Sequence, residues 1–209
     1  MKKTNNIILG AIMVMAITAQ TSNAKTLLGT NHVRGAFGMV KFGDNFSDDV
    51  LGYGYGFEGA VNIAVHSNID LNITGSYLTA DGDTAGVNID TTTLSGGASL
   101  LYHFSPRETV NPFISAGVGA VRSELEIAGS EEHETDTGLN AGAGIEIEAS
   151  ENILCRIRGD YINIDNEDDI AFTASAGYWF TARFMGEAGL SYSLDSEDIV
   201  ANLGLVFSM

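Results

Sequence analysis

The sequence contains one cysteine and two prolines among its 209 residues. The single cysteine, Cys155, excludes an intramolecular disulfide, and we expect it to be a small packing or membrane-facing residue. The apolar run at 7–19 covers 13 residues, whereas a membrane-spanning helix needs about 20. No long segment has the 3.6-residue period of an amphipathic helix. These absences favour a single all-β domain.

Basic residues are also scarce, with 10 lysines and arginines against 27 aspartates and glutamates. Two of the lysines precede the apolar run, and the small residues Ser22-Asn23-Ala24 follow it, which is the layout of a secretory signal peptide at 1–24. The mature domain, 25–209, then keeps 8 basic and 27 acidic residues, a net charge of −19. Nucleic acid is not an expected partner, because phosphate binding needs a basic patch.

The clearest pattern in the chain is the strict alternation of residues 139–160. Apolar side chains occupy every second position on both sides of the turn-like Ser150-Glu151-Asn152, while the opposite face of the second half carries Arg156, Arg158 and Asp160. A period of two predicts a β-hairpin with one aliphatic and one charged face. In a soluble sandwich the aliphatic face would be the core, whereas in a membrane barrel it faces lipid and the charged face lines the lumen.

The segment 51–65 favours the barrel. Its apolar face is bulky and includes Tyr53, Tyr55 and Phe57, while the opposite face is mostly glycine and alanine. A narrow barrel needs small residues inside and large ones toward lipid, and aromatic residues near one end are typical of an interfacial girdle.

Similar alternation recurs along the chain and predicts an up-and-down antiparallel transmembrane β-barrel of ten strands, with eight as the alternative. An even number of strands is usual for bacterial barrels. The period of residues 111–127 fits both faces equally well and assigns no lumen side. The expected strands lie near 31–42, 51–65, 69–77, 90–104, 111–127, 139–149, 153–160, 172–180, 184–194 and 199–208.

Acidic residues gather in every second predicted connection. Alternate connections of an up-and-down barrel emerge at the same end, so 17 of the 27 acids should crowd one rim, and the short turns should mark the periplasmic end. Water and monovalent ions can solvate these loops, or divalent cations can bind there weakly and bridge the rim to lipid phosphates. The clusters are Asp44, Asp48 and Asp49; Asp81, Asp83 and Asp90; Glu131, Glu132, Glu134 and Asp136; Asp165, Glu167, Asp168 and Asp169; and Asp195, Glu197 and Asp198. The two clusters with four acids, 131–136 and 165–169, are the expected cation sites.

Charged residues on the predicted polar faces should pair inside the lumen, because an unpaired buried charge costs several kcal/mol. We expect Glu146 and Glu148 to lie across from Arg156 and Arg158. The full predicted network is Arg34, Glu58, Glu146, Glu148, Arg156, Arg158, Asp160, Arg183 and Glu187. At about ten strands the bore should be narrow, since open aqueous channels are typical of about 16–18.

The leader, the glycine-rich alternating strands, NPFISAGVGA at 111–120 and NLGLVF at 202–207 together resemble the small outer-membrane β-barrel proteins of Gram-negative bacteria, the OmpA- and OmpX-like group. The resemblance implies an outer-membrane location and contact with membrane lipid and lipopolysaccharide. Many members of that group have eight strands and end in an aromatic residue, whereas ten strands are predicted here and Phe207 is followed by Ser208-Met209.

Motifs with chemical meaning are sparse. His103-Phe104-Ser105 resembles the His-x-Ser pattern of outer-membrane lipid A deacylases, and His133 among the acids of 131–136 has the residue types that omptin proteases use. The calcium-loop start at 81–86 has Ala85 at its fifth position and lacks the final glutamate. The leading hypothesis is a non-enzymatic outer-membrane barrel without cofactor, with a structural, surface-interaction or narrow-channel role. A lipid-modifying or proteolytic barrel and a soluble periplasmic sandwich are the alternatives.

Overall fold

A computed structural model describes residues 31–43, 51–84, 87–105, 108–127, 129–165 and 167–209. The predicted leader, 1–24, and the acids Asp44, Asp48 and Asp49 lie outside the described residues. Within the described ranges, no helix is long and apolar enough to cross a membrane.

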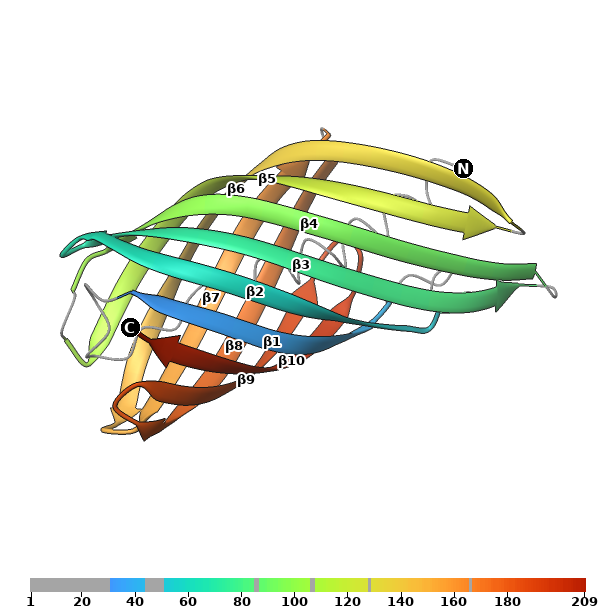
Figure 1. Ribbon diagram of the computed structural model, residues 1–209. Helices are drawn as coiled ribbons and strands as arrows, with labels where there is room; N and C mark the ends of the chain where they lie inside the picture. Colours follow the sequence, from blue (N-terminus) through green and yellow to red (C-terminus); the bar gives the residue numbers. More distant parts are fainter. Residues whose placement is uncertain (1–30, 44–50, 85–86, 106–107, 128, 166) are drawn as a thin grey trace.

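The described residues form ten strands, each antiparallel to the next, and β10 pairs with β1 to close a barrel (Figure 1). The prediction of a ten-stranded antiparallel barrel is confirmed. The strands are β1 His32–Lys41, β2 Tyr53–His66, β3 Ile69–Thr84, β4 Val87–His103, β5 Val110–Ile127, β6 Ser130–Ser150, β7 Ile153–Ile164, β8 Glu167–Thr181, β9 Phe184–Ser193 and β10 Ile199–Ser208.

Side chains alternate between a buried lumen face and an exposed outer face along each strand. In β1, Arg34 is 3% exposed, whereas Phe37 is 45% exposed. Away from the loop-end rim the outer face is apolar, as a lipid-facing surface must be. The structure also resolves β5, whose period was ambiguous: Asn111 and Phe113 point inward, while Ile114 points outward.

Exposed aromatic side chains form two girdles on the outer face. One lies toward the loop end of the barrel and the other lies toward the short turns, as expected for side chains at the two membrane interfaces. The loop-end girdle includes Tyr53, Tyr55, Tyr77, Tyr161 and Tyr192, and the turn-end girdle includes Tyr102, Phe104, Tyr178, Phe180 and Phe207.

Four strands continue past the loop ends of their neighbours. Pairing of β3 with β2 ends at Ala80, and pairing of β6 with β7 ends at Gly138, but both strands run on. The part of β3–β6 beyond these points is called the projecting sheet, and Figure 1 shows these strands extending beyond β1, β9 and β10. The acids at 81–90 and 131–136 therefore lie on strands, as do those at 167–169 at the start of β8, and their assignment to loops was wrong. Continued pairing with adjacent strands explains the difference.

The orientation of the outer face generates a stability prediction. Leu203 is 67% exposed on β10, whereas Thr135 is exposed on the projecting sheet beyond the loop-end girdle. Leu203→Arg should lower the unfolding free energy in lipid vesicles by about 2–4 kcal/mol, because the arginine enters the hydrocarbon region. Urea titration measures this loss, with Thr135→Arg as the nearly neutral control. Equal effects of the two substitutions would contradict the assigned membrane face.

Candidate functional site in the lumen and at the outer rim

The loop end of the lumen is filled by apolar side chains that meet from six strands and two adjoining segments. Val40 near the end of β1 and Phe42 just after it are both fully buried there. This group, called the outer cluster, consists of Val40, Phe42, Leu51, Leu78, Ala80, Val121, Ile162, Ile164, Ala171 and Val200, with Ile89 and Leu125 packed against it. A smaller group of Trp179, Met185 and Val206 lies at the turn end.

Between these groups, buried charges pair across the lumen. Arg34 bonds Glu58 on β2, and its Nε donates to Glu187 Oε2 on β9 at 3.1 Å. This contact joins three strands that meet only because β10 pairs with β1. Each residue of the trio is at most 7% exposed, so the ions are held in a dry environment where pairing matters most.

The β6–β7 hairpin contributes two more arginines. Arg156 lies directly across from Glu146 and donates to Glu146 Oε1 from its Nε at 2.9 Å, as predicted. Arg158 lies across from Gly144 and bonds Asp160 of its own strand at 2.5 Å and Ser115 Oγ at 2.9 Å.

Two members of the predicted network are placed differently. Glu148 lies across from Leu154. In this antiparallel register Glu146 pairs with Arg156, so Arg158 lies across from Gly144, on the other side of Glu146 from Glu148. Arg183 is exposed in the β8–β9 turn, outside the lumen, because β9 begins one residue later at Phe184. The prediction for Arg183 was wrong, and so was the expectation that Glu148 lies across from one of the two arginines.

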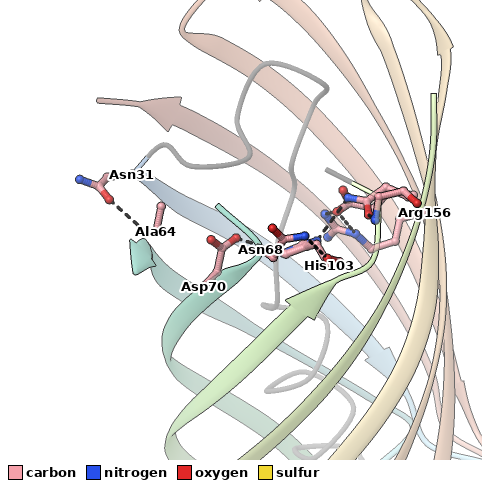
Figure 2. Close-up of polar contacts among 9 residues, drawn as sticks. Asn31, Ala64, Asn68, Asp70, His103 and Arg156 are labelled. Atoms are coloured by element: carbon pink, nitrogen blue, oxygen red, sulfur yellow. Dashed lines mark hydrogen bonds and ion pairs between the residues drawn. The ribbon is translucent and has the colours of Figure 1, made fainter. Parts of the chain in front are cut away.

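A polar group at the turn end was missing from the prediction. His103 Nε2 lies 3.1 Å from Asp70 Oδ2, and His103 Nδ1 lies 3.3 Å from Asn111 Nδ2. Figure 2 shows His103 and Asp70 together with Asn68, whose Nδ2 donates to the His103 carbonyl at 2.8 Å. Both ring nitrogens of His103 thus face Asp70 and Asn111, so the histidine is not directed at Ser105 as a deacylase base would be. The alternation already placed Asp70 and His103 on polar faces, and this signal could have found them.

The two predicted cation clusters approach each other at the rim. Burial raises the pKa of Asp136, and the nearby charges of Glu134 and Asp165 raise it further. Asp168 instead accepts hydrogen bonds from Tyr161 Oη at 2.5 Å and Asn163 Nδ2 at 2.6 Å, and the bond from Tyr161 is the larger cause of its lowered pKa.

Among the described residues, no three or more histidine, cysteine or acidic side chains are arranged to hold a metal ion. Cation binding by Glu131, Glu132, Glu134, Asp136, Asp165, Glu167, Asp168 and Asp169 stays a prediction.

The rim also exposes a strand edge. Residues Ser130–Thr137 of β6 pair with β5 on one side, from Ile127–Ser130 to Ala120–Thr137. On the other side, no described strand pairs with them, because β7 begins its pairing at Gly138. This segment is called the open edge.

The charge network generates a stability prediction. Glu146→Gln should lower the unfolding free energy by about 3–5 kcal/mol, because Arg156 then stays buried without a paired carboxylate. Urea denaturation in detergent micelles measures the loss. Glu124→Gln is the matched control, since Glu124 pairs with Arg122 on the exposed projecting sheet at 2.7 Å and should contribute less than about 1 kcal/mol. A similar loss in both variants would contradict a buried network.

Comparisons with solved structures reproduce the barrel. The translocator domain of the autotransporter NalP from Neisseria meningitidis is 9% identical with a TM-score of 0.58, and covers 99% of this chain and 97% of its own. The transport unit of the autotransporter AIDA-I from Escherichia coli is 11% identical, with a TM-score of 0.56 and coverage of 98% and 97%. The outer membrane protein OprG from Pseudomonas aeruginosa is 12% identical, with a TM-score of 0.50 and coverage of 90% and 99%. At these identities the likeness concerns the fold.

Among curated proteins, no match to this chain is found. The family model described as outer membrane protein beta-barrel domain matches residues 7–180, which is most of the chain. Together with the closed barrel, its apolar outer face and its two aromatic girdles, this match shows that the chain belongs to the outer membrane protein beta-barrel domain family and is a protein of the Gram-negative outer membrane.

Proposed function

We propose that this protein is a non-enzymatic surface-interaction protein, in which the barrel is the membrane anchor and the projecting sheet is the binding element. The open edge at Ser130–Thr137 is the observation that carries the proposal. Two further features support the proposal: the lumen is filled by side chains, and the open edge carries acidic side chains.

The lumen is poorly suited to general diffusion. The outer cluster occupies its loop end with side chains such as Phe42 and Val200, both fully buried. Below it, Arg34 bridges Glu58 and Glu187 from opposite sides of the β1–β10 closure. Barrels of about eight strands are filled in the same way, and open aqueous channels are typical of about 16–18 strands.

The open edge offers main-chain hydrogen bonds to a partner. A strand edge presents unpaired N–H and C=O groups, and an extended peptide can add to it as a further strand. Eight consecutive residues of β6 have this geometry, and Ser130–Thr135 are all exposed. An added strand of that length would form a regular ladder with β6.

The charges of the edge decide which peptide fits. The edge reads SEEHETDT, and alternate side chains point to opposite faces, so Glu132, Glu134 and Asp136 lie on one face and Glu131 on the other. A partner strand would therefore meet carboxylates on both of its faces. Lysine or arginine at alternating positions complements this arrangement, whereas a second copy of the same acidic edge would be repelled. The proposed partner is an extended cationic segment of another protein.

The first test of this proposal concerns conductance. Planar-bilayer recordings of the purified protein should show no large, stable openings, because the outer cluster and the charge network fill the bore. A general-diffusion porin reconstituted under the same conditions is the positive control. Large and stable openings would overturn the anchor role and indicate a channel.

The second test concerns strand addition. A synthetic peptide of alternating threonine and lysine should bind the protein in lipid nanodiscs, as measured by surface plasmon resonance. Methylation of alternate backbone amides of the peptide should reduce the affinity at least tenfold, because it removes main-chain donors and keeps the charge.

A shortened protein provides the matched control. Arg122 and Thr135 lie directly across from each other, so an Asn-Gly turn can join them in place of residues 123–134. This variant keeps the barrel and should lose peptide binding. Undiminished binding to the shortened variant would place the interaction elsewhere, and equal binding of the methylated peptide would reduce it to charge attraction.

A further inference from the structure

The projecting sheet has two chemically different faces. Ile89 on β4 and Leu125 on β5 pack against the outer cluster, so the face that carries them is turned toward the mouth of the lumen. This face is called the inner face. Val87 and Ile127 lie on the same face, because side chains two positions apart in a strand point the same way. The four apolar residues Val87, Ile89, Leu125 and Ile127 are called the apolar floor.

The opposite face of the projecting sheet is polar. An antiparallel sheet in water is commonly polar on its solvated face and apolar on the face that it buries. The alternation in β3–β6 beyond the membrane has this form, so the inner face is the one expected to be covered. The outer face carries Asp81, Asp83, Asp90, Arg122, Glu124, Glu126, Glu131 and His133.

Part of the apolar floor is open. Ile127 is 42% exposed and Val87 is 38% exposed, whereas Val121, nearer the barrel on the same face of β5, is 4% exposed. Ile89 lies directly across from Ile127 and packs against the outer cluster, so the exposed side chains continue that cluster without a break. An exposed apolar surface that continues a core marks an interaction site, unlike a single exposed residue.

Carboxylates border the apolar floor along β6. Glu132 lies directly across from Leu125, and Glu134 and Asp136 follow on the same face. Among the described residues of the inner face there is no lysine, arginine or histidine. Burial raises the pKa of Asp136, and the charge of Glu134 raises it further, so a cation at this border would favour the ionised form of Asp136. The border therefore complements a partner with positive charge.

A segment that lies on the inner face must supply its own main-chain hydrogen bonds. β4 is paired with β3 and β5, and β5 is paired with β4 and β6, so their backbone groups are already used. A helix meets this condition because its hydrogen bonds are internal, and its diameter of about 10 Å covers two strands that lie about 4.8 Å apart. The six residue steps from Val121 to Ile127 span about 20 Å, which is the length of a helix of about 14 residues.

We propose that the inner face of the projecting sheet is a docking site for an amphipathic, cationic helix of another protein. The apolar side of the helix packs on the apolar floor, and its lysines or arginines pair with Glu132, Glu134 and Asp136. The site is separate from the open edge, which binds through its backbone, and it does not depend on strand addition.

Surface plasmon resonance with a synthetic helix tests the site. The probe has about 14 residues, with leucine along one side, lysine along the adjacent side and alanine elsewhere. It should bind the protein in nanodiscs of zwitterionic lipid after binding to empty nanodiscs is subtracted. A peptide of the same composition without the helical period should bind about tenfold more weakly, because it cannot present both sides at once.

Substitutions on the two faces locate the binding. Ile127→Ser should weaken binding of the helix about fivefold, because it removes apolar contact area. Glu132→Gln should weaken it about threefold by removing one ion pair. Glu131→Gln is the matched control, since it makes the same charge change one residue away on the outer face, and it should leave the affinity unchanged.

The proposal is overturned if the helical and the non-periodic peptides bind equally, or if Glu131→Gln weakens binding as much as Glu132→Gln. Circular dichroism checks that each variant is folded. If Ile127→Ser does not fold, an unchanged affinity in Val87→Ser overturns the proposal.

The peptide of alternating threonine and lysine separates this site from the open edge. Ile127→Ser should leave binding of that peptide unchanged, because Ile127 lies on β5 and the edge is on β6. If only the threonine-lysine peptide binds the wild-type protein, the helix site is overturned and strand addition stands. If only the helix binds, strand addition is overturned and the helix site stands.

Discussion

Closure of the sheet by the pairing of β1 with β10 is the constraint on which the rest of the molecule depends. Hydrocarbon offers no hydrogen bonds, so a strand edge inside the membrane would leave its backbone groups unsatisfied. The β1–β10 ladder runs from His32–Ser208 to Lys41–Ile199 and removes that edge. It also brings Glu187 of β9 within reach of Arg34, so the central ion pair exists only in the closed barrel.

The requirement that every strand edge be paired applies only within the membrane. Beyond the loop-end girdle, water can hydrate an unpaired strand, and β6 keeps an edge there that it could not keep lower down. Acidic side chains on this edge are compatible with solubility, since like charges oppose edge-to-edge association of two copies. Within the membrane β6 is paired on both sides, whereas outside the membrane one of its edges is open and acidic.

Much of this architecture is local and could be read from the sequence. Strand alternation assigns the lumen face of β7 because successive side chains must point to opposite sides, and the turn at Ser150-Glu151-Asn152 sets Arg156 across from Glu146. Arg183 was misplaced because alternation does not show that β9 starts after it. The acids at 131–136 were assigned to a loop because their strand depends on pairing with β5, which is not a local property. The Arg34–Glu187 contact also depends on which strands are neighbours in the closed barrel, and no residue pattern along the chain displays it.

The unequal strand lengths give the mouth of the barrel an oblique outline. Strands β1, β9 and β10 have 10 residues each, whereas β6 has 21, so one wall stands above the others. The barrel is therefore asymmetric about its long axis, with β6 on its tall side and β1, β9 and β10 on its short side. Rotation of the barrel about the membrane normal moves the edge of β6 around the circumference, and a partner of the kind proposed above would meet that edge from one direction only. Rotational diffusion of the barrel would then contribute to the rate at which such a partner binds.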